Sequence, residues 1–432
     1  MLKYAIPQPF IDNIQEMQCT GLQDVQAPKF APHDFICIIE FLKQYTNNKA
    51  TFEAYRREIE RLLQWSWLIA EKSILDLKRQ DIEEYIAFCL KPPKSWIGTK
   101  RTPRFITRDG ERKVNPQWRP FVAHVSKSEH KQGITVDKYK YQPSQKSIQE
   151  IFTVLSSFYN YLALEEKVAL NPIALIKQKS KYIQKQQTKS VVMRLNERQW
   201  QCCLGTTKEI AELEPIHERT LFMLSALYLL YLRISELASS ERWTPQMNHF
   251  YQDSNGAWWF KTVGKGNKMR EIAVPDDMLT ALKRYRKSMQ LSLLPAVNDK
   301  TPLFPKEKGK GAMTSTRHIR RLIQDCFDRA TYQLRENGFT TDADALEEAT
   351  VHWLRHTGIS DDINKRGRPV SHVRDDAGHS SSAITDRYND IELTQRHRSA
   401  KNKKLKGSSV QSLLQSKNSS DDAMLLSEPN TE

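Results

Sequence analysis

The sequence predicts a mainly α-helical chain of two domains with a small β-hairpin in the second domain, an α+β arrangement. Three observations support this fold class. At 432 residues the chain exceeds one typical domain. Apolar residues recur at helical spacing on both sides of a polar, lysine-rich stretch at 177–194. Two short β-rich runs, "AWWFKTV" and "KMREIAV", flank the turn sequence "GKGN", which indicates a hairpin.

The first domain is expected at residues 31–176, after an N-terminal extension of residues 1–30. "DFICIIEFLKQY" repeats apolar residues at helical spacing, and "TFEAYRREIERLLQWSWLI" predicts a helix with Thr51 as its N-cap. Further helices are expected at 75–90 and in "SIQEIFTVLSSFYNYLALEE". Between them, proline, glycine, tryptophan and arginine break the periodicity, which predicts an irregular basic insertion at about 91–143.

Residues 177–194 are predicted to be a basic linker, and the second domain follows at 195–400. "RTLFMLSALYLLYLRISELAS" predicts a buried core helix, the hairpin comes next, and helices resume from about 315. The tail, residues 401–432, is polar and expected to be mostly disordered apart from "VQSLLQS".

The formal net charge of +15 favours a polyanionic partner. Five residues, called the linker lysines, are expected to contact that partner: Lys177, Lys179, Lys181, Lys185 and Lys189. No apolar run approaches the roughly 20 residues that a membrane span needs. The opening residues lack a charged segment followed by an apolar one, so no secretory signal is expected. With six cysteines and no C-x-x-C pair, we expect a cytoplasmic protein with reduced thiols. The missing phosphate-loop and H-E-x-x-H motifs argue against an NTPase and a zinc peptidase.

Two cationic residues, Arg233 and Lys265, occupy positions that suggest contact with a ligand. Arg233 interrupts an apolar stretch, which is costly unless the charge is paired or faces a ligand. Glu236, three residues later, shares its helical face, so a purely structural Arg–Glu pair is the alternative. Lys265 lies at the hairpin tip between Gly264 and Gly266, where it either meets a partner or remains a solvated turn lysine.

"HWLRHTG" places His352, Arg355 and His356 on one helical face, while Trp353 and Leu354 turn towards a core. A guanidinium and an imidazole side by side suit a phosphate, because arginine donates to two oxygens and histidine donates or accepts. A metal site is the competing interpretation, but a neighbouring arginine would repel a cation, so no metal is expected.

In "DDAGHSSSAITDRYND", Gly378 is predicted to end one helix, and Ser380 or Ser381 to cap the next. His379 is then placed at the helix junction, and Tyr388 on the short helix from about 381. By itself such a tyrosine is usually a packing residue.

Taken in order, an arginine, a hairpin lysine, H-x-x-R, Gly–His and a tyrosine resemble the tyrosine recombinase (phage integrase) family over about 195–400. Residues 34–175 resemble that family's helical, SAM-like core-binding domain. The resemblance implies a two-domain DNA clamp with its catalytic domain at 195–400. It implies a site-specific recombinase or integrase of a mobile element, phage or chromosome-maintenance system. The implied catalytic residues are Arg233, Lys265, His352, Arg355 and His379 around the scissile phosphate, and Tyr388 as nucleophile.

The family chemistry suits these groups. Arginines and histidine stabilise charge on the non-bridging oxygens without a metal. His352 is the candidate base for Tyr388, and Lys265 the candidate acid for the leaving oxygen, with Lys268 as a second possibility. A 3′-phosphotyrosine stores the bond energy, so no cofactor and no ATP are expected. The expected partner is double-stranded DNA with paired recombination sites, bound by a homo-tetramer in the nucleoid.

Two alternatives remain open: a type IB-like topoisomerase, and a non-catalytic DNA-binding regulator that retains the fold. The sequence also departs from the family pattern. Ala377 stands where leucine is common, no glycine accompanies Arg233, and the segments at about 91–143 and 331–349 lack counterparts. In relatives a C-terminal segment docks on a neighbouring subunit, a role for which "VQSLLQS" offers an apolar face.

Overall fold

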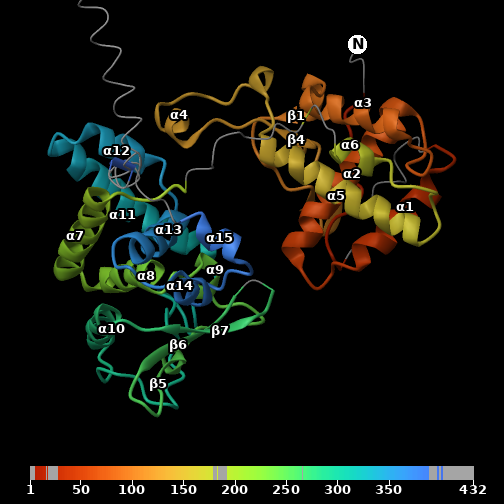
Figure 1. The fold of residues 1–432 in the computed structure, drawn as a ribbon. Helices are drawn as coiled ribbons and strands as arrows, with labels where there is room; N and C mark the ends of the chain where they lie inside the picture. Colours follow the sequence, from red (N-terminus) through yellow and green to blue (C-terminus); the bar gives the residue numbers. More distant parts are fainter. Residues whose placement is uncertain are drawn as a thin grey trace, which may run out of the picture. The chain divides into compact units, whose positions relative to one another are not determined.

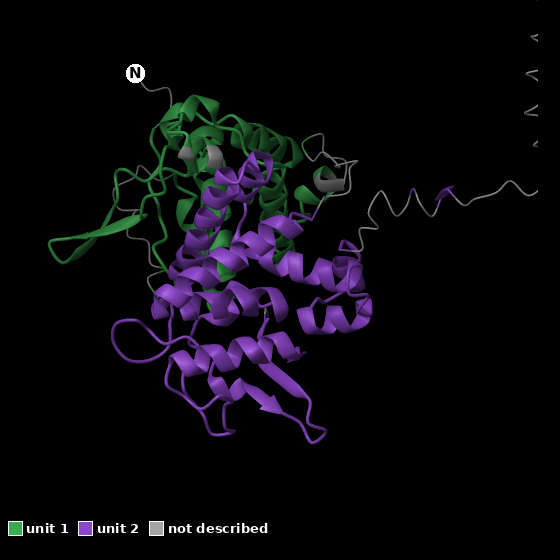
Figure 2. Cartoon of the chain, turned by 90° about the vertical axis from the view of Figure 1, so that its left-hand side faces the viewer, with its two compact units in different colours: residues 1–190 green, residues 191–432 purple. Residues whose placement is uncertain are grey.

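The chain divides into two units, residues 1–190 and 191–432, and the division falls inside the predicted linker (Figure 2). In a computed structural model, residues 5–15, 17, 28–178, 182, 192–264, 266–388, 397, 400 and 401 are described. Both units are mainly helical with small sheets, which confirms the predicted fold class (Figure 1). None of the described helices is long and apolar enough to cross a membrane.

The helices of unit 1 bury their apolar faces in one core, to which the long helix at 145–164 contributes residues such as Phe152, Leu155 and Phe158. The expected N-cap at Thr51 is wrong. The side chain of Asn48 accepts a hydrogen bond from the Thr51 amide at 3.2 Å, so Asn48 caps the helix and Thr51 lies inside its first turn. The helices are α1 (Ala31–Lys43), α2 (Lys49–Trp65), a π-helical turn (Ser66–Ala70), α3 (Arg79–Leu90), α4 (Lys127–Lys131), α5 (Gln145–Leu164) and α6 (Ile173–Gln178).

The insertion predicted to be irregular contains strands and a buried anchor. Asp109 and Gly110 both have positive φ, at 55° and 80°, as a two-residue type I′ hairpin turn requires. Trp96 and Phe121 are buried in the core of unit 1. The prediction failed because the residues beside this Asp–Gly turn are charged instead of alternating with apolar ones. The strands are β1 (Ile97–Gly98), which pairs in parallel with β4 (Phe121–Val122), and β2 (Phe105–Arg108), which pairs antiparallel with β3 (Glu111–Val114).

The N-terminal stretch packs against unit 1. Phe10 and Ile11 are buried in its core. The indole of Trp96 donates to the Ala5 carbonyl at 3.0 Å, and the side-chain amide of Gln64 donates to the backbone carbonyl of Gln8 at 2.7 Å. Residues 5–15 are therefore part of the folded unit.

Unit 2 contains the predicted hairpin, with a third strand added at its edge. Phe260 pairs with Ile272 across the antiparallel hairpin, and both are buried. The sheet lies at one end of the helices, beside α10 (Figure 1). The strands are β5 (Phe250–Gln252), β6 (Trp258–Val263) and β7 (Met269–Ala273), in the order β5-β6-β7. The helices are α7 (Glu197–Leu213), α8 (Glu218–Leu229), α9 (Ile234–Leu237), α10 (Asp276–Ser288), α11 (Thr316–Glu336), α12 (Thr340–Glu347), α13 (Val351–Asn364), α14 (Val370–Ala377) and α15 (Ser382–Asp386).

The single helix predicted over 219–239 is broken, and this prediction was wrong. α8 ends at Leu229, Tyr231 has a φ of +51°, and a new helix, α9, begins after Arg233. Residues on both sides of the break are buried, so the apolar pattern runs through it without a signal. The break matters because it places Arg233 at a helix start, with its backbone amide free for a side-chain cap.

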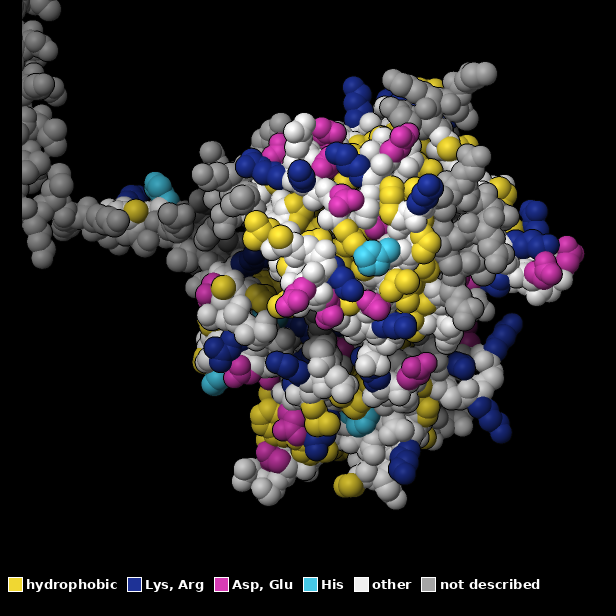
Figure 3. All heavy atoms as spheres, turned by 90° about the vertical axis from the view of Figure 1, so that its right-hand side faces the viewer, with side chains coloured by type: hydrophobic (Ala, Val, Ile, Leu, Met, Phe, Trp, Pro, Cys, Tyr) yellow, Lys and Arg dark blue, Asp and Glu magenta, His cyan; other side chains and the backbone are white. Residues whose placement is uncertain are grey.

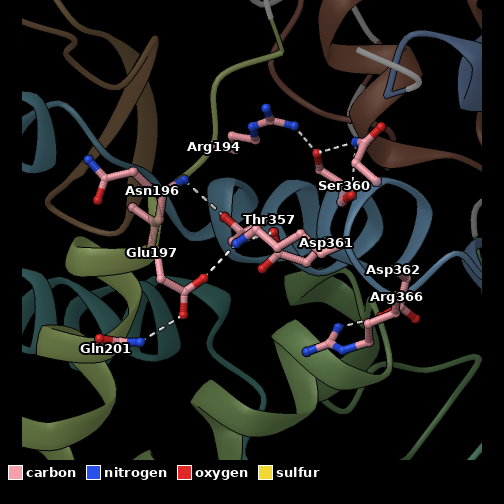
Figure 4. A network of polar contacts seen from close by, with 12 residues as sticks. Arg194, Asn196, Glu197, Gln201, Thr357, Ser360, Asp361, Asp362 and Arg366 are labelled. Carbon is pink, nitrogen blue, oxygen red and sulfur yellow. Dashed lines mark hydrogen bonds and ion pairs between the residues drawn. The ribbon is translucent and has the colours of Figure 1, made fainter. Parts of the chain in front are cut away.

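Two features hold α13 in place. At Gly358 a Cβ would lie 2.0 Å from the Tyr228 carbonyl oxygen, so α13 and α8 approach closely only because this residue is glycine. Polar contacts join α13 to the segment before α7 (Figure 4). The Leu195 amide donates to the Thr357 hydroxyl at 2.9 Å, and Lys365 pairs with Glu197 at 2.5 Å.

Charges of both signs cover the face of the molecule drawn in Figure 3. Lysine and arginine side chains are spread over it with aspartate and glutamate between them, and some project from the edge. The net charge of +15 is therefore not gathered in one patch on this face.

Candidate active site

An arginine–glutamate–arginine cluster joins α9 to the hairpin. Arg233 occupies the N-cap of α9, where its amide donates to Glu236 at 2.9 Å and its guanidinium reaches the same carboxylate at 3.0 Å. From β7, Arg270 donates two parallel hydrogen bonds to Glu236, at 2.8 and 2.7 Å. The predicted contact between Arg233 and Glu236 is thus present, and a second arginine completes the cluster.

Glu236 is buried, with 1% of its surface exposed, and it remains a carboxylate. Burial by itself would raise the pKa of Glu236, but hydrogen bonds and charge from Arg270 and Arg233 outweigh it and lower that pKa. Sequence reasoning missed Arg270. Its position on a short strand of mixed exposure gave no signal, although it lies five residues after Lys265 in the same hairpin.

The hairpin connection lies against this cluster. A Cβ at Gly264 would be 2.8 Å from Nη1 of Arg270 and 3.3 Å from Nη1 of Arg233, so a side chain there would displace the Arg270 guanidinium. Lys265 follows directly but lies outside the described residues. The described hairpin end therefore approaches the arginines, and the role of Lys265 stays a prediction.

Arg355 enters the site from α13 and is buried, with 2% of its surface exposed. Its guanidinium donates to the carbonyl of Tyr231, at the break after α8, and to the carbonyl of Ala377 at 2.5 Å. Burial, with the charge of Arg233 beside it, lowers the pKa of Arg355. His352 differs from it: one turn earlier on the helix, its side chain is exposed. Leu354 is fully buried and Trp353 packs against the core, as predicted.

The junction between α14 and α15 carries His379. Gly378, with a φ of +62°, caps α14 in the left-handed conformation, as predicted. Its carbonyl accepts from Arg233 at 3.3 Å, which ties the junction to the cluster. Nδ1 of His379 lies 2.9 Å from the Thr385 hydroxyl, and burial and nearby arginines lower the pKa of His379 to about 4. Ser381 takes the N-cap position of α15, although its side chain makes no capping hydrogen bond.

Tyr388 lies in a turn two residues after the end of α15, so its predicted place on that helix is wrong. The turn forms because the Tyr388 amide bonds to the Thr385 carbonyl at 2.9 Å. The ring is buried, with 4% exposed, and stacks on His379 with centroids 5.9 Å apart. Burial raises the pKa of Tyr388, and the charges of Arg355 and Arg233 oppose that rise.

The hydroxyl of Tyr388 contacts Nδ1 of His356. Sequence reasoning placed His356 on the same face as His352 but gave it no role. No sequence signal separates the two histidines, because both lie on one helical face and only the fold decides which of them meets residue 388.

The structure therefore brings Arg233 and Glu236 of α9 together with Arg355, His379 and Tyr388 from other parts of unit 2, and His352 lies exposed at the start of α13. Of the linker lysines, Lys177 lies at the end of α6 with its side chain undescribed, and the others fall outside the described residues. No group of three or more potential metal ligands occurs in the described part of the chain.

This arrangement can bind a phosphate and present a nucleophile to it. Two guanidinium groups held by carbonyls and a carboxylate provide fixed positive charge, and that of Arg355 is already desolvated by burial. A phenol lies within the same electrostatic field, since Arg233 and Arg355 both act on its pKa.

Comparisons with known proteins agree with this chemistry. A model described as "Phage integrase family" matches residues 177–394. The tyrosine recombinase XerD of Staphylococcus saprophyticus is 27% identical over 253 residues, which cover 58% of this chain and 74% of that protein. The tyrosine recombinase XerC of Chlorobaculum parvum is 22% identical over 258 residues, 57% of this chain and 69% of that protein. The crystal structure of the XerH site-specific recombinase bound to a palindromic difH substrate, a post-cleavage complex, shares the fold. It has a TM-score of 0.52 and 15% identity, with 89% of this chain and 92% of that chain covered.

Proposed function

The chain belongs to the phage integrase family, and we propose that it is a site-specific DNA recombinase that cuts and rejoins DNA with Tyr388 as nucleophile. The observation that supports this most directly is the position of the Tyr388 hydroxyl. It lies in the field of two arginines that come from different elements, and both are held in place by hydrogen bonds. The two relatives compared above are named tyrosine recombinases.

In the proposed reaction, Arg233 and Arg355 bind the non-bridging oxygens of the scissile phosphate, and His352 and His379 join them. The two guanidinium charges, with hydrogen bonds from the two histidines, stabilise the five-coordinate transition state. The Tyr388 oxygen bonds to phosphorus, the bond from phosphorus to the 5′ oxygen breaks, and a 3′-phosphotyrosine forms. Because the bond energy is conserved in this ester, the reverse step rejoins DNA without ATP.

Two residues support these groups. Glu236 orients Arg233, since it fixes both the amide and the guanidinium of that residue. Lys265 is the candidate acid for the 5′ leaving oxygen, and the glycine before it lies against the arginine cluster. Lys268 is the second candidate on the same hairpin.

The proposed partner is double-stranded DNA with paired recombination sites, recombined by a homo-tetramer. The linker lysines and the basic residues of the 91–143 insertion, all of which belong to unit 1, supply phosphate contacts. In the cell such a protein would work in the cytoplasm, on the nucleoid or on a mobile element.

The decisive variant is Tyr388→Phe, which removes one oxygen and keeps the ring. Binding to a recombination site should stay near wild type, because the arginines remain in place. On a nicked suicide substrate, wild-type protein should be trapped as a covalent adduct on the 3′ phosphate, visible as a shifted band on a denaturing gel. The phenylalanine variant should give no adduct.

The same assay separates the two alternatives. A non-catalytic regulator would give no adduct with either protein. A type IB-like topoisomerase would give an adduct and relax supercoils without paired sites, whereas a recombinase needs two sites and yields rearranged products. An adduct that persists in Tyr388→Phe would move the nucleophile to another residue.

A further inference from the structure

The hydroxyl of Tyr388 is held by a histidine other than the one that the H-x-x-R motif selects. Nδ1 of His356 makes a hydrogen bond with the Tyr388 oxygen, and the two rings lie 5.3 Å apart between centroids. His352 instead meets the ring of His356 edge-on, with centroids 4.3 Å apart. Among the described residues, His356 is therefore the side chain in contact with the oxygen that has to attack.

One face of α13 holds Tyr388 at both ends. His356 contacts the hydroxyl, and the side-chain amide of Asn364 donates to the backbone carbonyl of Tyr388 at 2.8 Å. Asn364 is itself fixed by a hydrogen bond of 2.9 Å to the Ser360 carbonyl. Positions 356, 360 and 364 follow one another at four-residue spacing, so they form a single row along the helix. Between the two anchors the ring packs with Ile359 in a small apolar cluster.

The charge state of His356 suits a hydrogen-bond partner more than a base. Burial, with positive charge from His352 and Arg355 nearby, lowers the pKa of His356 to about 3. The imidazole is therefore neutral at neutral pH, and it has one nitrogen free to accept the phenol hydrogen. An imidazole of such low basicity gains little by removing a proton from a phenol whose pKa is raised by burial.

We propose that His356 is a positioning residue that holds the Tyr388 oxygen in line with the phosphorus. The inference rests on the proposed function, because it takes Tyr388 as the nucleophile. In the transfer, the tyrosine oxygen bonds to phosphorus and the 5′ oxygen leaves with a proton from Lys265. The phenol proton passes to the general base, for which His352 remains the candidate, and not to His356.

Three substitutions test the role. His356→Leu and His356→Phe both remove the acceptor, with and without loss of the ring. His356→Asn keeps an oxygen close to the place of Nδ1, and this amide accepts a hydrogen bond but takes up no proton at neutral pH. His372→Leu is the matched control, since His372 is an exposed histidine on neighbouring α14.

The readouts are the single-turnover rate of covalent adduct formation on the suicide substrate and, separately, the Kd for the uncut site. The leucine and phenylalanine variants should form adduct about 10²-fold more slowly, the loss expected when a reacting atom is misplaced by about 1 Å. Their Kd should stay within about threefold of wild type, because no phosphate-binding group is changed. The asparagine variant should recover most of the rate, and His372→Leu should match wild type.

Either of two other results with the His356 variants would overturn the proposal. An asparagine variant as slow as the leucine variant would make His356 the proton acceptor. Faster adduct formation in the leucine variant would mean that the contact restrains the tyrosine instead of aligning it. If the leucine variant fails to fold, the phenylalanine and asparagine variants still give the comparison. An adduct that survives in Tyr388→Phe would refute the proposed nucleophile, and that result is independent of every His356 variant.

Discussion

Replacement of Arg270 by methionine should destabilise unit 2 and disable the site together. The substitution leaves Glu236 buried, with 1% of its surface exposed, and removes its two hydrogen bonds from Arg270, of 2.8 and 2.7 Å, together with the 3.0 Å bond from Arg270 to the Asp376 carbonyl. Removing one partner of a buried ion pair costs about 3–5 kcal/mol, because the remaining charge is left uncompensated. Since the amide and guanidinium of Arg233 still contact Glu236, we expect the low end of that range, about 3 kcal/mol.

A double-mutant cycle isolates this effect. In a Glu236→Gln background the loss of Arg270 leaves no buried carboxylate unpaired, so Arg270→Met should cost about 1 kcal/mol at most, as for an ordinary lost hydrogen bond. The coupling free energy should then be about 2 kcal/mol. Urea unfolding measures the loss, and native-state hydrogen exchange of β7 amides assigns it to unit 2. Lys261→Met provides the control, because the Lys261–Glu271 pair on the same hairpin is exposed at 43% and 49% and should contribute below about 1 kcal/mol.

The pH dependence follows from the sign of the Glu236 shift. In wild type the folded-state pKa of Glu236 is lowered. The ionised carboxylate therefore stabilises the folded protein at pH values above its unfolded-state pKa, and this stabilisation is lost as pH falls through its folded-state pKa. Without Arg270, burial should dominate and raise the folded-state pKa of Glu236. Protonation of this carboxylate then reduces the destabilisation of the variant as pH falls. The stability difference between the two proteins should therefore shrink below about pH 5. A coupling below about 0.5 kcal/mol, or a difference that grows on acidification, would refute the reasoning.

Four further outcomes are expected. Lys265→Ala should slow cleavage by about 10²–10⁴-fold, and a substrate with sulfur at the 5′ bridging position should restore this variant but not Arg355→Ala; equal rescue would exclude Lys265 as the acid. Gly358→Ala should lower the stability of unit 2 by about 1–3 kcal/mol in a thermal melt, because its Cβ would meet the Tyr228 carbonyl at 2.0 Å, and an unchanged melt would contradict the close approach. Changing the linker lysines to glutamine should flatten the log–log salt dependence of DNA binding by up to about 0.9 per lost phosphate contact, and an unchanged slope would mean that the linker does not touch DNA. Removal of the chain from Ser408 onward should impair recombination between two sites while single-site binding stays intact, and normal recombination would rule out a role in assembly.

Local patterns in the sequence were sufficient for most helices, for the hairpin of unit 2 and for the motif residues. Helical periodicity located α1, α5 and the core around α8, and "GKGN" located the β6–β7 turn, because each signal lies within about 20 residues. The order of Arg233, Arg355, His379 and Tyr388 could also be read along the chain. The break after α8 could not, since residues on both sides of it are buried and periodicity carries no information there.

Only the tertiary structure decided how the site is held together. Arg233 donates to the carbonyl of Gly378, 145 positions later in the chain. Arg270 donates to Glu236, 34 positions earlier, and to the carbonyl of Asp376 in α14, 106 positions later. Arg355 donates to the carbonyl of Tyr231, 124 positions earlier. His352 and His356 share one face of α13, and only the packing of Tyr388 against that helix selects His356 as its partner. The physical reason is that spacing along a helix determines which side chains share a face, whereas the partner of that face is determined by elements that are distant in sequence and meet when the core is buried.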